Sequence, residues 1–513
     1  MGLNTLDLVI IAVYLVGITL FGLKFRKKDR SLKDYFLADR NIPWWAISLS
    51  IVAAETSTLT IISIPGLAYD TDFGFLQIVF GYLIGRVIIS YILIPHYFRG
   101  DLFTAYQLMD RRFGPRLRSL TAGLFLITRA AAEGVRVFAV AIVVGIALAG
   151  MLSGLGDFGR DVAAIAIVTV LTLIYTFEGG MAAVIWTDVI QMFIYVAGTI
   201  VGLFTLLHHV PGGWSTISEA AAAHHKFRIF YFQWNFWQTY TFWSGLIGGA
   251  FLTTASHGTD QLIVQRLLAA KSEAQSKVAL ISSGVFVLFQ FTLFLLIGVM
   301  LYVFYNSAGH VLTAMRSDRI FPTIIVSEMP HGISGLLIAA ILAAAMSNLS
   351  AALNSLSSSS IVDFYLRRRP NATDAQRLSI SRAATIFWGL LLFVLAIVSR
   401  RGGRVVEIGL AIASVAYGAL LGVFLLGVLT KRANERGARV GLFVGFVLNL
   451  YIWQEQNLWT WLEPILHWSL KLPHPIPFPW YVMIGSLVTF GVGMIASILM
   501  KDSNLPGGER AHA

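Results

Sequence analysis

Apolar runs of about 20 residues, the length that an α-helix needs to cross roughly 30 Å of hydrocarbon, recur along this sequence from Leu8 to Met500. Short polar stretches separate them. Hydrophobic residues make up 57% of the 513 residues, and charged residues only 13%. Because a soluble domain cannot bury that much apolar surface, the sequence predicts an all-α integral membrane protein surrounded by a lipid bilayer.

The apolar runs predict thirteen transmembrane helices. They cover residues 7–24, 44–70, 74–98, 119–150, 161–178, 181–208, 238–258, 278–305, 332–364, 382–399, 405–429, 438–454 and 480–500. Of the 38 basic residues, 26 fall in the loops of one face, 9 in the loops of the other and 3 within spans. By the positive-inside rule we expect a multi-pass protein of the cell (inner) membrane, with the N-terminus outside and the C-terminus cytoplasmic.

The same composition argues against several classes of function. The net charge of +11 is spread over loops that face lipid headgroups, so it does not indicate nucleic-acid binding. The chain has no cysteine, no HExxH zinc motif, no Walker-type phosphate loop and no Gly-x-Ser-x-Gly elbow. We therefore expect neither enzyme activity nor a nucleic-acid partner, and the sequence does not predict the oligomeric state.

Polar residues within the spans indicate function, because each costs free energy in hydrocarbon unless it faces a cavity or a partner. The second span contains the run Ala53-Ala54-Glu55-Thr56-Ser57-Thr58-Leu59-Thr60, followed by Pro65-Gly66. This pattern predicts a discontinuous helix, whose freed carbonyls and nearby hydroxyls are suitable ligands for a hard monovalent cation. The alternative is a continuous helix with Ser and Thr bonded back to the preceding turn, but it does not explain the carboxylate of Glu55.

The span 332–364 has small and polar residues on one face. They follow helical spacing at Ala344, Ser347, Ala351 and Asn354. Small residues let helices approach closely, so tight packing alone explains most of the serines of this span. If the helix packs against the stretch 53–60, the Ser347 hydroxyl and the Asn348 amide oxygen would lie beside the freed carbonyls. These oxygens would together form a cage for a cation.

Arg129, Glu133 and Arg136 are spaced to lie on one side of the fourth span, facing the protein interior. One interpretation is a structural ion-pair network. In the other, Glu133 pairs with Arg129 and leaves the Arg136 guanidinium to hold a solute carboxylate in bidentate fashion. Asp188 lies about two turns into its helix, close to the cytoplasmic face. It either assists ion release, with a possible second ion, or pairs with a loop arginine.

Four blocks of sequence resemble those of a known family and occur in its order on the expected spans. They are Asp34-Tyr35-Phe36-Leu37 with Arg40; Glu178-Gly179-Gly180-Met181 with Trp186-Thr187-Asp188-Val189-Ile190-Gln191; Asp260-Gln261 with Val264-Gln265-Arg266; and Ala351-Ala352-Leu353-Asn354-Ser355. Each block alone is weakly specific, but the four together are specific. The chain resembles, nearly end to end, the sodium/solute symporter family, which includes carriers of proline, sialic acid, glucose and iodide.

The resemblance implies a transporter core of ten helices in two inverted five-helix repeats, whose first helix is broken. Residues 44–430 correspond to this core. Residues 1–43 would form an N-terminal extra helix and a cytoplasmic loop, and residues 431–513 two C-terminal helices and a cytoplasmic tail. The thirteen predicted spans agree with this arrangement.

The resemblance also implies a bound sodium ion. The sodium site of the family corresponds to the carbonyls of Ala53, Thr56 and Ala344 and to the side chains of Ser347 and Asn348. The family usually has a second hydroxyl residue at position 348, where the amide oxygen of Asn348 can still coordinate an ion. Some members bind a second sodium through the residue matching Asp188 and further hydroxyls, but Ala351 replaces one of these. We therefore expect one sodium ion.

The small-molecule solute follows less directly from the resemblance. The sugar carriers place amides, a carboxylate and a tyrosine at positions that here are Thr60, Val79, Thr253 and Ser256, so a sugar pocket of that kind is not evident. Glu55 instead matches an acidic position of the proline-type carriers, which bears on sodium and substrate binding. A small carboxylate or amino acid is the leading expectation. The candidate substrate residues are Glu55, Ser57, Thr58, Thr60, Arg136 and Thr253.

Sodium-driven symport by alternating access is thus the leading hypothesis. Within transport, the alternative is a proton-coupled or uncoupled carrier with Glu55 or Asp188 as the titrating group. From a different class of function, the alternative is a transporter-like membrane sensor that acts through a partner on the cytoplasmic loops.

Overall fold

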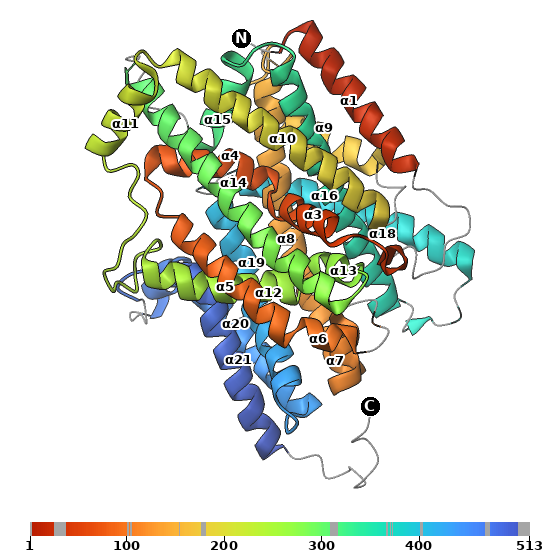
Figure 1. Cartoon of the computed structure of the whole chain (residues 1–513). Helices are drawn as coiled ribbons and strands as arrows, with labels where there is room; N and C mark the ends of the chain where they lie inside the picture. The colour runs from red at the N-terminus through yellow and green to blue at the C-terminus, as the bar shows by residue number, and fades with distance from the viewer. Residues whose placement is uncertain are drawn as a thin grey trace.

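The structure is a computed structural model, and the chain it describes is built from helices (Figure 1). The described residues are 3–24, 37–99, 102, 105–152, 154–175, 181–307, 316–365, 368–369, 371, 373–400, 404–466 and 472–500. A helix lies at each of the thirteen ranges predicted to span the membrane. These helices are α1 (Thr5–Leu23), α3 (Trp44–Glu55) with α4 (Thr58–Asp70), α5 (Leu76–Ile92) with α6 (Ile94–Phe98), α8 (Pro115–Ala147), α9 (Asp157–Tyr175), α10 (Met181–His209), η2 (Ser244–Gly248) with α12 (Gly249–Gly258), α14 (Glu273–Ser307), α16 (Ile333–Ser359), α18 (Asp374–Ser399), α19 (Val405–Leu429), α20 (Glu435–Leu466) and α21 (Pro479–Leu499).

Length and apolar composition single out fewer helices than thirteen. Within the described ranges, seven helices are long and apolar enough to cross a membrane, and the bent pair α3 and α4 adds an eighth. Two further apolar helices, over Thr5–Ile18 and Ala383–Ser399, are shorter. The all-α membrane fold is therefore confirmed, while the number of thirteen spans stays a prediction.

The second predicted span is discontinuous, as its polar run indicated. α3 ends at Glu55 and α4 begins at Thr58, and the two helices are bent by 64° relative to each other. Pro65 lies inside α4, so the helix breaks among the hydroxyl residues and not at the proline. Short hydroxyl side chains bond to nearby backbone groups and thereby compete with helical bonds, as Thr60 does by donating to the Glu55 carbonyl at 3.3 Å.

The broken pair lies near the middle of the molecule, with helices on several sides (Figure 1). α14 packs along both α3 and α4, α10 packs against α3, and α8 packs against α4. α16, the helix with the small polar face, contacts α8, α10 and α4. The expected approach of α16 to the break is thus observed. Thr56, Ser57 and Thr58 at the break are buried as a result, although all three are polar.

Glycines let α5 and α12 approach each other closely. A Cβ atom built on Gly249 would overlap the carbonyl oxygen of Ile78, and one built on Gly81 would overlap that of Gly245. Small residues at a helix interface are the usual means of close packing in a membrane. The contact brings Arg86 of α5 and His257 of α12 to Glu55 at the end of α3.

Four short helices lie between the predicted spans: α7 (Ala105–Phe113), α11 (Gly213–Ala223), α13 (Gln261–Leu268) and α15 (Ser317–Ser327). α15 packs against α4 and α8, and the Asp318 carboxylate accepts a hydrogen bond from Ser63 of α4 at 2.6 Å. Lys226, just beyond α11, donates to the carbonyls of Tyr69 and Thr71 at 2.7 and 2.8 Å. These contacts hold the end of α4 that is far from the break.

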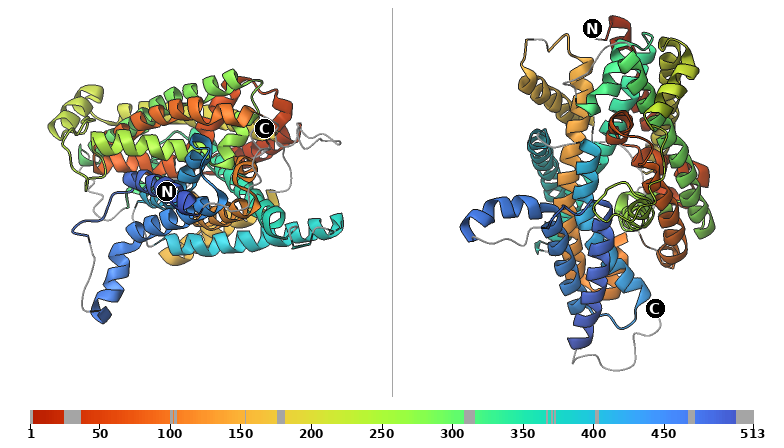
Figure 2. Two further views of the ribbon diagram at one scale, coloured as in Figure 1. Left: turned by 90° about the horizontal axis from the view of Figure 1, so that it is seen from below. Right: turned by 90° about the vertical axis from the view of Figure 1, so that its left-hand side faces the viewer.

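The last two helices pack beside the rest. α20 and α21 contact each other and α19, and the end of α20 extends away from the other helices (Figure 2). Gly437, Gly441 and Gly445 of α20 face α21, where a Cβ atom on any of them would overlap neighbouring atoms. The division into residues 1–43, 44–430 and 431–513 stays a prediction.

The first helix is attached to the start of α16 by one buried carboxylate. Asp7 accepts hydrogen bonds from the backbone N–H groups of Gly332 at 2.6 Å and Gly335 at 3.2 Å, and it lies 3.1 Å from His331 Nδ1. The first N–H groups of a helix have no intrahelical partner, so a carboxylate from another helix satisfies them well. Asp7 thereby caps α16 from 325 residues away in the sequence.

Candidate functional site

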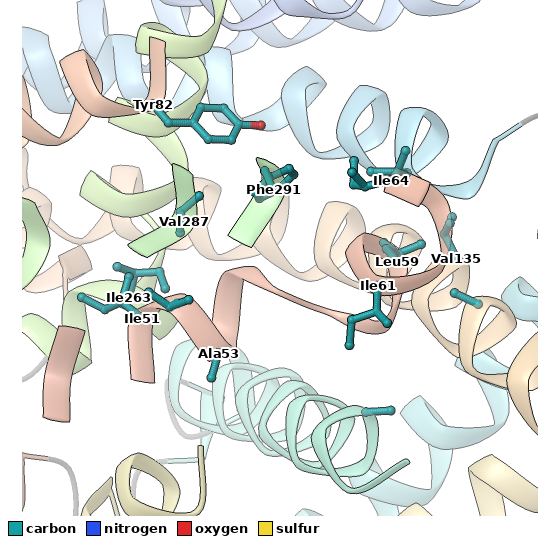
Figure 3. Packing of buried hydrophobic residues seen from close by; sticks show 14 of the residues in the cluster. Ile51, Ala53, Leu59, Ile61, Ile64, Tyr82, Val135, Ile263, Val287 and Phe291 are labelled. Carbon is teal, nitrogen blue, oxygen red and sulfur yellow. The ribbon is translucent and has the colours of Figure 1, made fainter. Parts of the chain in front are cut away.

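The backbone between α3 and α4 leaves carbonyl oxygens without their helical partners. The Ser57 N–H donates to Glu55 O at 2.9 Å, so the Ala53 carbonyl loses the donor that a continuous helix would supply. The Thr60 N–H donates to Ser57 O at 2.9 Å, and the Thr56 carbonyl loses its donor in the same way. Figure 3 shows the extended connection between the end of α3, which carries Ala53, and the turn of α4 that carries Leu59 and Ile61.

Residues from two other helices reach the break. The Thr56 hydroxyl donates to the Oε1 atom of Gln290 in α14 at 2.8 Å. Asn348 of α16 lies with Ser57 and Thr58 around a small cavity, where the buried Thr58 hydroxyl has no hydrogen-bond partner among the described residues. The structure therefore places Asn348 beside the break, while its role as a sodium ligand stays a prediction. The side chains of Ala344 and Ser347 lie outside the described part of the structure.

A larger cavity of about 170 Å³ adjoins the break. Aromatic side chains form much of its wall, and the Phe75 and Phe291 rings stack there at 5.3 Å. Polar side chains project from α3, α4, α8, α12, α13, α16 and the turn before α13. Apart from tyrosines, the polar lining residues are Glu55, Ser57, Thr60, Thr128, Arg129, Arg136, Thr253, Ser256, His257, Asp260, Arg266 and Asn348. Of the predicted substrate residues, only Thr58 does not line this cavity, and it lines the smaller one.

Two residues that the sequence interpretation did not assign lie beside the carboxylate of Glu55. Arg86 of α5 forms an ion pair with Glu55, and its guanidinium is completely buried. His257 of α12 places Nε2 at 3.4 Å from the same carboxylate oxygen and at 3.3 Å from Arg86. A charge within a predicted span is the sequence signal that could have pointed to Arg86. Its partner Glu55 lies on another helix, 31 residues away in the sequence.

Both arginines of α8 pair with Glu133. Its carboxylate lies 2.8 Å from Arg129 and 2.7 Å from Arg136. Of the two interpretations, the structure shows the ion-pair network; Glu133 does not pair with Arg129 alone, because the i+3 neighbour reaches the same oxygen. The two arginines still differ: the Arg129 side chain is 7% exposed and Arg136 29% exposed. Arg136 also lines both cavities.

Asp260 connects α13 to α8 and α19. One carboxylate oxygen accepts from the Leu262 N–H at 2.9 Å and so caps α13. The other accepts from the Tyr417 hydroxyl at 2.8 Å and lies 3.5 Å from Arg129. The sequence marked Asp260 as part of a family block but gave it no role.

Asp188 is engaged inside the protein. It lies 3.0 Å from Arg266 and accepts a hydrogen bond from the Ser50 hydroxyl at 2.7 Å. Arg266 Nε donates to the same hydroxyl at 2.9 Å. Of the two interpretations of Asp188, the structure shows the pairing with an arginine, and that arginine belongs to helix α13 and not to a loop.

These features define a class of protein: a helical membrane transporter with a broken helix beside a central polar cavity. A family model described as "Sodium:solute symporter family" matches residues 35–445. The chain belongs to the sodium:solute symporter family. It is a sodium-dependent carrier and not an enzyme, as the resemblance implied. Parts of two family blocks, residues 34–36 and 178–180, lie outside the described residues.

Individual relatives support this membership. The chain is 28% identical to the sodium/sialic acid symporter NanT of Aliivibrio fischeri, over 98% of this chain and 94% of that protein. It is 32% identical to the sodium/sialic acid symporter SiaT of Proteus mirabilis, over 85% and 86%. It is 27% identical to the human sodium/iodide cotransporter, over 85% and 67%.

Solved structures of transporters share the fold. An outward-open, substrate-bound Na⁺-coupled sialic acid symporter, for which a novel Na⁺ site was described, superposes with a TM-score of 0.79 at 28% identity. It covers 97% of this chain and 98% of that one. A nucleobase-cation-symport-1 family transporter superposes with a TM-score of 0.53 at 11% identity, over 93% and 96%, which shows likeness of fold alone. The inverted-repeat transporter fold is thereby confirmed.

Proposed function

We propose that this protein carries a small organic anion together with one sodium ion by alternating access. The observation that carries the proposal is the break between α3 and α4, where freed carbonyls adjoin a cavity that contains both hydroxyl groups and arginines. Carbonyl and hydroxyl oxygens suit sodium, and a guanidinium suits a carboxylate. The break and the adjoining cavity therefore offer ligands both to the sodium ion and to the organic anion.

The proposed sodium ligands are the carbonyls of Ala53, Thr56 and Ala344 and the side chains of Ser347 and Asn348. The lost helical partners of the Ala53 and Thr56 carbonyls support this assignment, as does the position of Asn348 beside the break. The pairing of Asp188 with Arg266 argues against a second ion at Asp188, because a cation there would have to displace a guanidinium.

The proposed solute is a carboxylate, bound by Arg136 with hydroxyls from the broken helix and α12. Ser57, Thr60 and Thr253 line the same cavity as Arg136, and the exposure of Arg136 leaves part of its guanidinium open to a ligand. Two of the relatives carry sialic acid, an acidic sugar, and a third carries iodide, which is also an anion. A sialic acid-like acid with several hydroxyl groups fits this combination of donors.

The proposed orientation keeps the N-terminus outside and the C-terminus in the cytoplasm, in the cell (inner) membrane. In that orientation α7 and α13 face the cytoplasm, and residues of both helices, including Tyr106 and Leu262, line the central cavity. The cavity would then lead from the break towards the cytoplasm. The stacked rings of Phe75 and Phe291 would close it on the outer side.

Uptake into proteoliposomes tests the proposal. Radiolabelled sialic acid should accumulate when sodium is high outside, and potassium should not replace sodium. Uptake driven by a proton gradient alone, with sodium irrelevant, would refute sodium coupling in favour of a proton-coupled carrier. Binding of sialic acid without any uptake would instead favour a sensor.

A further inference from the structure

The guanidinium of Arg86 has a partner for every nitrogen atom. One Nη group pairs with Glu55, the other donates to the Tyr82 carbonyl at 3.3 Å, and Nε donates to the Ser283 hydroxyl at 3.2 Å. The Arg86 side chain has no exposed surface and does not line the cavity, whereas Glu55 does. Arg86 is therefore fixed behind Glu55, on the side away from any ligand.

The neighbouring histidine satisfies its contacts without a charge. In neutral His257, Nε2 accepts from Arg86 at 3.3 Å and the protonated Nδ1 donates to the Ser256 hydroxyl at 2.9 Å. This tautomer leaves the Glu55 carboxylate to Arg86. The charges that face His257 are therefore Glu55 and Arg86, with Asp260 also within electrostatic reach from the start of α13.

The charges around the cavity cancel. Among the described residues that line the cavity or form an ion pair with a lining residue, acids and bases are equal in number. The acids are Glu55, Glu133, Asp188 and Asp260, and the bases are Arg86, Arg129, Arg136 and Arg266. Four negative charges thus meet four positive ones. A site of low dielectric strongly disfavours a net charge, so sodium alone would leave this cavity one charge too positive.

We propose that Arg86 sets the charge of the solute that this carrier accepts. By neutralising Glu55, Arg86 leaves the sodium-loaded cavity in need of one negative charge, which a singly charged anion supplies. The inference rests on the proposed sodium coupling and assigns to Arg86 the selection of the proposed anion over a solute that carries an ammonium group.

The carboxylates of the cavity support this selection. An amino acid would need a free carboxylate for its ammonium group, and the only carboxylates among the described lining residues are those of Glu55 and Asp260. Glu55 is held by Arg86, and Asp260 is held by Tyr417, Arg129 and the cap of α13. Breaking either set of contacts to bind an ammonium group would leave a buried arginine or helix end without its partner.

Sodium binding without any solute tests the role of Arg86 directly. Arg86→Gln leaves Glu55 uncompensated beside the break, so sodium affinity should rise roughly tenfold by charge attraction. Glu55→Gln leaves Arg86 uncompensated and should lower sodium affinity by a similar factor. The double variant restores the balance and should bind sodium like the wild type. Arg86→Lys is the matched control, because it keeps the charge and should change sodium affinity little.

The double variant separates charge compensation from direct coordination. If Glu55 were itself a sodium ligand, the double variant would bind sodium as weakly as Glu55→Gln, and the inference would be overturned. Unchanged or weaker sodium binding in Arg86→Gln would overturn it as well. Absence of sodium binding in the wild type would refute the proposed function itself, so the two failures are distinguishable.

A second experiment measures solute binding with lactate, alanine and sialic acid. Lactate carries a hydroxyl group on the carbon where alanine carries an ammonium group. In the presence of sodium, the anions should raise the unfolding temperature of the wild type more than alanine does, and this preference should weaken in Arg86→Gln. If alanine raises the unfolding temperature of the wild type as much as the anions do, or more, the selection of an anion is overturned. It is also overturned if no anion raises that temperature.

Discussion

The two arginines of α8 should respond differently to substitution, although both pair with Glu133. Arg129 lies between two carboxylates, those of Glu133 and Asp260, and is almost completely buried. Arg129→Met leaves Asp260 without its arginine, so the free energy of unfolding should fall by about 3–5 kcal/mol. Arg136→Met leaves Glu133 still paired with Arg129, and because Arg136 is partly exposed the cost should be about 1 kcal/mol.

Substitution by lysine separates solute binding from stability. Arg136→Lys keeps the charge but loses the planar fork that holds a carboxylate, and the loss of one charge-assisted hydrogen bond of about 1.5 kcal/mol or more corresponds to roughly a tenfold weaker affinity. The unfolding temperature and the sodium affinity should stay close to the wild-type values. Arg129→Lys, the matched control, should lower the unfolding temperature and change solute affinity less.

Both quantities are accessible in detergent. Unfolding followed by intrinsic fluorescence gives stability, and competition against labelled sialic acid gives solute affinity. Parallel losses of stability and affinity at both positions would refute the reasoning. The three residues would then form a structural network, and the assignment of a carboxylate to Arg136 would lose its main support.

Other positions give independent predictions. Ser347→Ala should weaken the apparent sodium affinity while expression stays normal. Asn348→Ser should keep sodium-coupled uptake, and Asn348→Leu should lose it. Uptake by the Leu variant equal to that of the wild type would show that Asn348 is not a sodium ligand. Gly249→Ala should lower the free energy of unfolding by about 1–3 kcal/mol, because the added methyl group overlaps Ile78, and an unchanged unfolding temperature would contradict this close contact. Lys226→Met should increase hydrogen exchange at the end of α4, since two carbonyls lose a donor there, and exchange like that of the wild type would mean that other contacts suffice.

The break in the first core helix was predictable because its cause is local. Adjacent hydroxyl residues compete for backbone hydrogen bonds within a few residues of themselves, and a carboxylate at membrane depth calls for a polar environment. The break lies between Glu55 and Thr58, within the predicted stretch 53–60, whereas Pro65 lies inside α4 and does not cause it.

The partners of the buried charges were not predictable in the same way. Glu55 and Arg86 lie on different helices, and Asp188 and Arg266 are 78 residues apart in sequence. Hydropathy indicates which residues lie within the membrane, but it does not indicate which helices are neighbours. Which charged residues come into contact depends on how the helices pack. That packing rests on contacts such as the one between Gly249 and Ile78, which a single sequence does not reveal.

The cap that Asp7 forms on α16 has a consequence for biogenesis. The ribosome makes α1 first, but the backbone N–H of Gly332 that Asp7 binds appears only 325 residues later. At about 5–20 residues per second, α1 waits roughly 15 to 65 seconds before its binding partner exists. During that interval the Asp7 carboxylate has neither a helix end to cap nor a protein interior to enter, so it must stay at the membrane surface or with the insertion machinery. The contact that fixes the first helix can therefore form only after about two thirds of the chain has been synthesised.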